Sequence, residues 1–132
     1  MIRRLCAVLS VVMLACSGCA LENRVSIAPG ATRDSLTFAI GGANGTADTR
    51  VIYGLTVERC GGDVVLWTVV ANGTRTLPDR IRYGQLLPGF ATTAGPLPLS
   101  PGCYRVIVSE APPVTFDVSP DGVVRAREHC CP

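Results

Sequence analysis

Short runs in which apolar and polar residues alternate recur along the chain from residue 25 onwards. The runs are rich in β-branched residues and are separated by Gly, Pro, Asn and Asp, and no stretch after the first 20 residues keeps a helical period. A period of two is typical of half-buried β-strands. The pattern predicts strands around residues 25–27, 36–40, 51–60, 64–70, 80–83, 103–109, 114–118 and 123–126.

The run at residues 64–70 differs because both of its faces are apolar. One face carries Val65, Trp67 and Val69, and the other carries Val64, Leu66 and Val70. A strand covered on both sides has this pattern. We therefore expect this strand to be central in its sheet.

Turn signals separate the predicted strands. Asn44-Gly45 and Asn72-Gly73 suit the type I′ turn of a hairpin, since both residue types tolerate a positive φ. Gly61-Gly62-Asp63 is expected to join the third and fourth strands. Residues 86–101 contain four prolines, which favours a long irregular crossover that could present a binding surface.

Short strands at this spacing predict an all-β protein, an antiparallel β-sandwich of about seven or eight strands. The segment Leu99-Ser100-Pro101-Gly102-Cys103-Tyr104-Arg105-Val106 resembles the corner and following strand of immunoglobulin-like and transthyretin-like sandwich domains. The resemblance implies a structural role for Tyr104, whose hydroxyl would bond to the backbone at the corner. The Cys, Trp, Cys order of antibody domains is missing, because Trp67 follows Cys60 too closely.

The first 19 residues form a segment of a different kind. Arg3 and Arg4 precede an apolar run at residues 5–15, which leads into Cys16-Ser17-Gly18-Cys19. The run is too short to span a bilayer, which takes roughly 20 apolar residues. The segment resembles the signal peptide and lipobox of bacterial lipoproteins, whose cysteine receives a diacylglycerol. We expect residues 1–18 to be a signal peptide and residues 19–132 a single sandwich domain.

Two cysteines compete for the lipid. Cleavage before Cys19 leaves four downstream cysteines, an even number, whereas cleavage before Cys16 leaves Cys19 as an odd thiol. Cys19 is therefore the expected lipidation site and Cys16 the alternative, while a secretory signal without lipidation remains open. The resemblance implies a protein anchored in the bacterial cell envelope, facing the periplasm or in the outer membrane. Ala20 after Cys19 is compatible with outer-membrane sorting.

Charge and composition exclude several classes of function. Of 12 basic residues, Arg3 and Arg4 belong to the signal segment, so ten remain against ten carboxylates, and the chain has no lysine. A neutral domain argues against nucleic acid, and against a polybasic membrane patch, as a partner. The absence of lysine excludes Schiff-base chemistry and a P-loop phosphate site.

The remaining cysteines point to crosslinks. In an oxidising compartment Cys60, Cys103, Cys130 and Cys131 are expected to form two disulfides. A bond between the neighbours Cys130 and Cys131 would be strained, so each is expected to pair with Cys60 or Cys103 and to hold the tail on the sheet. The alternative is a zinc or copper site made by His129, Cys130 and Cys131 with Cys60 or Cys103, which lacks the support of a CxxC spacing.

No constellation for catalysis is present in the sequence. His129 is the only histidine, no GxSxG serine elbow occurs, and the carboxylates are not grouped. We therefore expect a protein without a cofactor or enzymatic activity, a lipid-anchored interaction or structural module that docks to another envelope protein. The alternatives are a periplasmic small-ligand or metal-binding protein and an envelope inhibitor or immunity protein.

Overall fold

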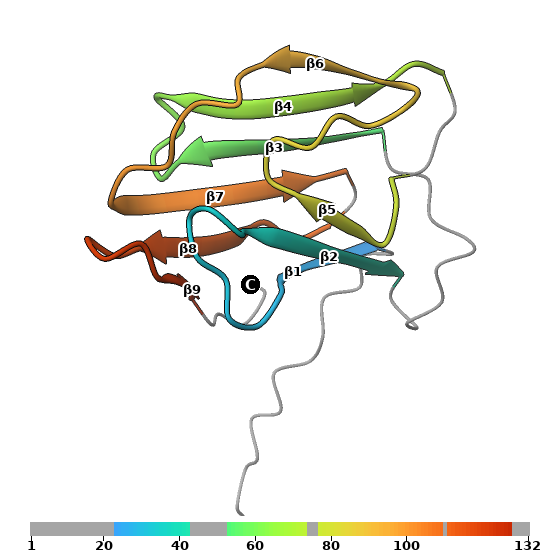
Figure 1. Ribbon diagram of the computed structural model, residues 1–132. Coiled ribbons are helices and arrows are strands. Elements are labelled where there is room, and N and C mark those ends of the chain that lie inside the picture. The colour runs from blue at the N-terminus through green and yellow to red at the C-terminus, as the bar shows by residue number, and fades with distance from the viewer. Residues whose placement is uncertain (1–22, 43–52, 74–76, 110, 128–132) are drawn as a thin grey trace, which may run out of the picture.

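The computed structural model describes residues 23–42, 53–73, 77–109 and 111–127. Within these ranges the chain forms nine strands, all paired antiparallel, and no helix (Figure 1). The strands are β1 (Asn23–Ile27), β2 (Thr37–Gly42), β3 (Gly54–Arg59), β4 (Val65–Ala71), β5 (Arg80–Arg82), β6 (Phe90–Ala94), β7 (Gly102–Val108), β8 (Val114–Val118) and β9 (Val124–Ala126). The predicted all-β, antiparallel sandwich class is confirmed.

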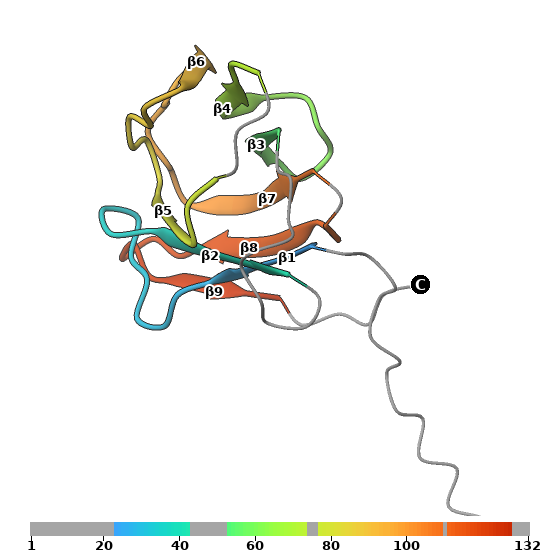
Figure 2. The ribbon, with the colours of Figure 1, turned by 90° about the vertical axis from the view of Figure 1, so that its right-hand side faces the viewer.

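The strands form two sheets. One has three strands in the order β1-β2-β5, and the other has six in the order β6-β4-β3-β7-β8-β9. Figure 2 shows the six-stranded sheet descending from β6 to β9, with β5, β2 and β1 beside its lower part. The two sheets are linked at one end, where Thr32 forms a bridge with Val123 and the backbone N–H of Val124 donates to the carbonyl of Ala31.

The core lies between the sheets because alternate residues of each strand point inward. In β7 the inward residues Tyr104, Val106 and Val108 are all buried, as their alternation predicts. Phe116 stacks on Tyr104 from its own sheet and meets Phe38 of the other sheet, with ring centroids 5.6 and 6.2 Å apart. Each such buried apolar side chain stabilises the fold by about 1.5–3 kcal/mol.

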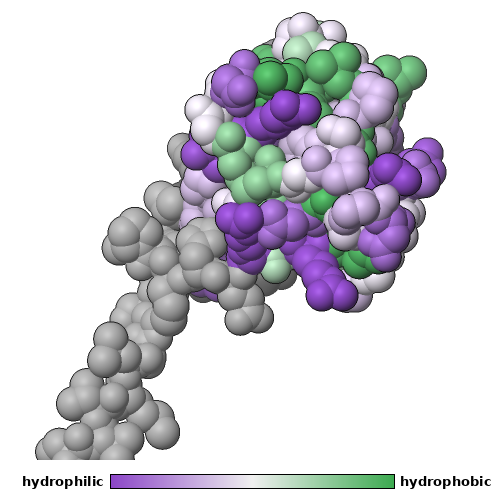
Figure 3. Space-filling view, turned by 90° about the vertical axis from the view of Figure 1, so that its left-hand side faces the viewer, coloured by the Kyte–Doolittle hydropathy of each residue, from purple (hydrophilic) through white to green (hydrophobic). Residues whose placement is uncertain are grey.

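Strand β4 is neither central nor covered on both faces, so that prediction is wrong. It is the second strand from an edge, and Val65 and Val70 are each 42 % exposed. A bulge explains how Leu66 and Trp67 are nevertheless both in the core: Val57 pairs with Trp67 and Glu58 with Val65, which leaves Leu66 as an extra residue. Hydrophobic residues gather on the surface near the top of Figure 3, where β4 and β6 lie.

The turn predictions have mixed outcomes. Gly61, Gly62 and Asp63 connect β3 to β4 as predicted, and φ is +99° at Gly61 and +74° at Gly62, values that favour glycine. Asn72-Gly73 does not close a hairpin, because β4 and the next strand, β5, belong to different sheets. The other expected hairpin turn, Asn44-Gly45, lies outside the described residues.

Residues 86–101 contain a strand that the sequence pattern does not predict. Strand β6 pairs with β4, with Phe90 opposite Ala71 and Ala94 opposite Thr68. The four prolines of the segment fall outside β6, and its centre is the β-branched pair Thr92-Thr93, which suits a strand. The prediction of an irregular crossover therefore holds on either side of β6 and fails within it.

The corner before β7 has the predicted bond. The hydroxyl of Tyr104, whose residue is 1 % exposed, donates to the carbonyl oxygen of Ser100 at 2.5 Å. This is the contact that the resemblance to sandwich domains implied. The bond holds the proline-containing segment against the start of β7.

Replacing Tyr104 by phenylalanine is expected to lower the free energy of unfolding by about 1–2 kcal/mol, because the part-buried Ser100 carbonyl then has no donor. Tyr83→Phe is the matched control: the Tyr83 hydroxyl donates to the Leu97 carbonyl at 2.7 Å, but this bond is exposed and water can replace it. Urea unfolding measures both variants. Equal losses in the two variants would contradict the structural role of the corner.

Candidate functional site

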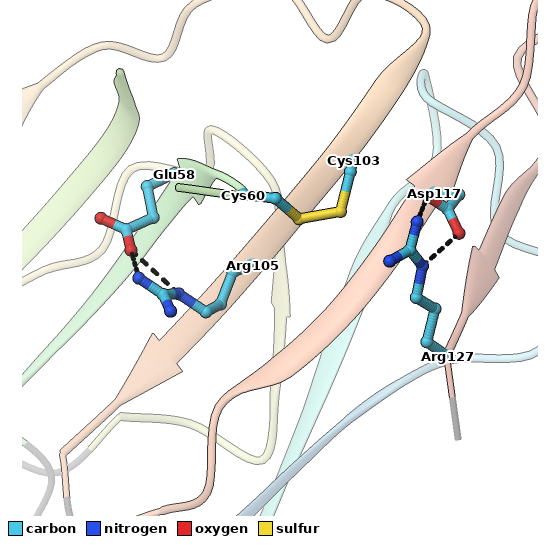
Figure 4. The surroundings of a disulfide bond; sticks show 6 residues. All are labelled: Glu58, Cys60, Cys103, Arg105, Asp117 and Arg127. Atoms are coloured by element: carbon cyan, nitrogen blue, oxygen red, sulfur yellow. Dashed lines mark hydrogen bonds and ion pairs between the residues drawn. A yellow bond between two sulfur atoms is a disulfide. The ribbon is translucent and has the colours of Figure 1, made fainter. Parts of the chain in front are cut away.

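A disulfide joins Cys60 to Cys103 (Figure 4). Arg59 of β3 pairs with Tyr104 of β7, so the antiparallel register places the adjoining residues Cys60 and Cys103 opposite one another. Their Cα atoms are 5.4 Å apart, and the N–H of Cys60 donates to the Cys103 carbonyl at 3.1 Å. That Cα separation is usual for a disulfide.

The Cys60–Cys103 bond contradicts the predicted disulfide pairing and limits the ligands of the alternative metal site. The prediction that Cys60 and Cys103 each pair with a cysteine of the tail is wrong, because β3 and β7 hold the two cysteines against each other. Cys130, Cys131 and His129 lie outside the described residues, as do Cys16 and Cys19. The alternative metal site would have to form without Cys60 and Cys103, whose sulfur atoms are bonded to each other.

The disulfide lies on the outer face of the six-stranded sheet. Tyr104 points into the core, so its neighbour Cys103 points outward, and Cys60 is exposed to solvent. In antibody domains the disulfide instead crosses the core between the two sheets. Here the bond crosslinks two adjacent strands of one sheet.

An ion pair lies beside the disulfide on the same face. Glu58 and Arg105 are register partners, and the Nε of Arg105 donates to Oε1 of Glu58 at 2.9 Å, while its Nη2 contacts the same oxygen. The Glu58 side chain is 11 % exposed and that of Arg105 is 38 % exposed. The charge of the Glu58 carboxylate is thus balanced by Arg105 on the neighbouring strand. This arrangement suits a structural role better than proton transfer.

A second ion pair lies further along the same sheet. Arg127 donates to both carboxylate oxygens of Asp117, at 2.7 and 2.8 Å (Figure 4). The bonds from Arg127 lower the pKa of the Asp117 carboxyl. The side chains are 55 % and 43 % exposed, so water weakens the pair. In the described part of the chain, no group of three His, Cys, Asp or Glu side chains could hold a metal ion.

A hollow of about 480 Å³ lies beside the corner that precedes β7. It is lined by Arg33, Asp34, Tyr83 and residues 98–101. The ring of Tyr83 packs against buried Trp67 with centroids 5.3 Å apart, and its hydroxyl donates to Leu97. These contacts give Tyr83 a packing role.

Burial, with a smaller effect of Tyr104, raises the pKa of Tyr83 from 10.0 to about 12, against the lowering effect of the Leu97 bond. The fold therefore favours the neutral phenol. Because the folded-state pKa is the higher one, this contribution to stability is present below pH 10 and is lost as the pH rises toward 12. At neutral pH this hydroxyl is a hydrogen-bond donor and not a base.

Comparisons with protein-family models, with curated proteins and with solved structures find no match to this chain. The described residues also include no helix with the length and apolarity needed to cross a bilayer. The function is therefore inferred from the residues and their arrangement.

Proposed function

We propose that this protein is a lipid-anchored module of the bacterial cell envelope that binds another envelope protein and performs no catalysis. Cys19 carries the lipid in this proposal, with Cys16 as the alternative. The observation that carries it is the Cys60–Cys103 disulfide, because such bonds persist in oxidising compartments. This agrees with the export that the lipobox-like segment implies.

The strand order supports an immunoglobulin-like rather than a transthyretin-like sandwich. Strands β1, β2 and β5 correspond in order and pairing to strands A, B and E of that fold, and β4, β3, β7 and β8 to C′, C, F and G. Tyr104 then stands near the start of strand F, where the tyrosine corner of the fold occurs. Immunoglobulin-like domains are frequent at cell surfaces, in keeping with an interaction module.

Strand β6 supplies the docking edge in this proposal. Sheet edges expose unpaired N–H and C=O groups, and charged side chains usually prevent unwanted pairing there. Among the four edge strands of the described sheets, β1, β5 and β9 carry arginine, whereas β6, Phe90-Ala91-Thr92-Thr93-Ala94, carries no charge. Thr92 and Thr93 are exposed, and the edge lies inside the predicted binding segment at residues 86–101. A strand of the partner can extend the sheet here.

Labelling with radioactive palmitate tests the anchor. Wild type and Cys16→Ser are expected to incorporate label, and Cys19→Ser is expected to incorporate none, because its sulfur atom is the acyl acceptor. Immunoprecipitation followed by autoradiography gives the result. Label that persists in Cys19→Ser and disappears in Cys16→Ser assigns the lipid to Cys16, and absence of label from all three refutes the anchor.

Thr92→Arg tests the docking edge, because a charge in the middle of β6 is expected to oppose strand addition. Ala126→Arg places the same charge on β9, at the opposite edge of the same sheet, and is the matched control. We expect the yield of crosslinked partner from intact envelopes to fall about tenfold with Thr92→Arg and to stay at the wild-type level with Ala126→Arg. Equal yields from both variants would refute docking at β6.

A further inference from the structure

In the part of the chain that the structure describes, the charged side chains are divided unequally between the two outer faces of the sandwich. In the three-stranded sheet Val25, Phe38, Ile40 and Ile81 are buried, so the alternate residues point outward. These outward residues, here called the arginine face, are Arg24 and Ser26 of β1, Thr37, Ala39 and Gly41 of β2, and Arg80 and Arg82 of β5. Among the described residues, the face therefore holds three arginines and no carboxylate.

The three arginines are exposed, whereas the residues between them are small. Arg80 stands opposite Ala39, Arg82 opposite Thr37 and Arg24 opposite Gly41. A Cβ placed on Gly41 would meet no atom within 4 Å, so the face is open at the end of β2, opposite Arg24. In Figure 1, β2 and β5 lie in front of the six-stranded sheet. Three exposed guanidinium groups, with only small side chains between them, suit a flat, negatively charged partner.

The outer face of the six-stranded sheet is different. There Arg105 is paired with Glu58, and Arg127 with Asp117. Net neutrality of the domain argued against a basic membrane patch, but net charge does not report how charges are distributed between faces. The carboxylates that balance Arg105 and Arg127 lie on the outer face of the six-stranded sheet, which points away from the arginine face.

The position of the expected lipid brings the arginine face close to a membrane. Strand β1 begins at Asn23, four residues after Cys19, and its second residue is Arg24. Four extended residues span at most about 14 Å. A lipid on Cys19 would thus hold the first strand of the arginine face within reach of the headgroups.

We propose that the arginine face lies against anionic phospholipid headgroups of the membrane that holds the lipid of Cys19. The inference rests on the proposed function, since the anchor supplies the proximity. Each arginine near an anionic surface strengthens binding about fivefold, so three give about a hundredfold, and salt screens the effect. The acyl chains hold the protein in the membrane, and the arginine face sets its orientation. The β6 edge belongs to the other sheet and stays free for a partner.

The test uses the purified lipidated chain in nanodiscs of phosphatidylcholine alone or with about one-third phosphatidylglycerol. Phenylglyoxal modifies exposed arginines, and peptide mass spectrometry reports the rate at each site. We expect the anionic lipid to slow modification of Arg24, Arg80 and Arg82 about fivefold or more and about 1 M salt to reverse this. Arg59 and Arg125, which are exposed outside this face, are internal controls whose rates should not change.

Variants test whether the arginines act together. The double variant Arg80→Gln with Arg82→Gln is expected to abolish the protection of Arg24, whereas Arg125→Gln should leave it unchanged. Equal rates at Arg24, Arg80 and Arg82 on both lipids overturn the proposal. Protection that occurs equally on neutral lipid, or that survives high salt, also overturns the proposal. Such protection would show that the arginines are covered by something other than anionic headgroups.

Failure of the anchor is recognised separately, because intact mass shows whether the chain carries acyl groups. If it carries none, co-sedimentation of the same chain with vesicles of the two compositions tests the arginine face alone. Salt-sensitive binding to anionic vesicles would then support the face although the anchor has failed. Absence of binding would refute the arginine face as well as the anchor.

Discussion

The burial of apolar side chains between the two sheets is the constraint on which the other features depend. Phe38 of the small sheet meets Phe116 of the large one, and Phe116 stacks on Tyr104. Because side chains alternate, burying Tyr104 and Val106 forces Cys103 and Arg105 to the outer surface of the same strand. A shift of one residue in β7 would reverse these faces, so the core also determines where the disulfide and the ion pair lie.

The register between β3 and β7 determines which outward side chains of the two strands contact each other. It sets Glu58 opposite Arg105 and brings Cys60 opposite Cys103, so one pairing provides both an ion pair and a crosslink. The same alternation in the small sheet turns Arg24, Arg80 and Arg82 outward. In the proposed arrangement the arginine face lies on the membrane, and the uncharged β6 edge of the other sheet receives the partner.

Local patterns predicted the strands and the class of the fold. The alternation at residues 103–109 identified β7 and its buried face, and the resemblance to sandwich domains implied the bond of Tyr104. The alternation pattern did not predict β6, because the prolines around it mask a short strand that is stabilised by pairing with β4. It also misjudged β4, since a bulge depends on the partner strand and leaves no local signal.

The candidate site was less predictable, because it depends on residues distant in the sequence. Cys60 and Cys103 are 43 positions apart, and only the register shows that they face each other and not the tail. The arginine face likewise combines strands from both halves of the described chain, so a neutral composition concealed it. Lipidation at Cys19 and the fate of Cys130 and Cys131 stay predictions from the sequence.

The proposed function requires that the domain is exported and that its cysteines are oxidised. Its most direct test is to block free thiols in intact cells, then purify the protein and map its cysteine peptides without reductant. An exported, oxidised domain yields a peptide pair joined through Cys60 and Cys103, with neither thiol blocked. Recovery of both cysteines in the blocked, unlinked form would contradict it.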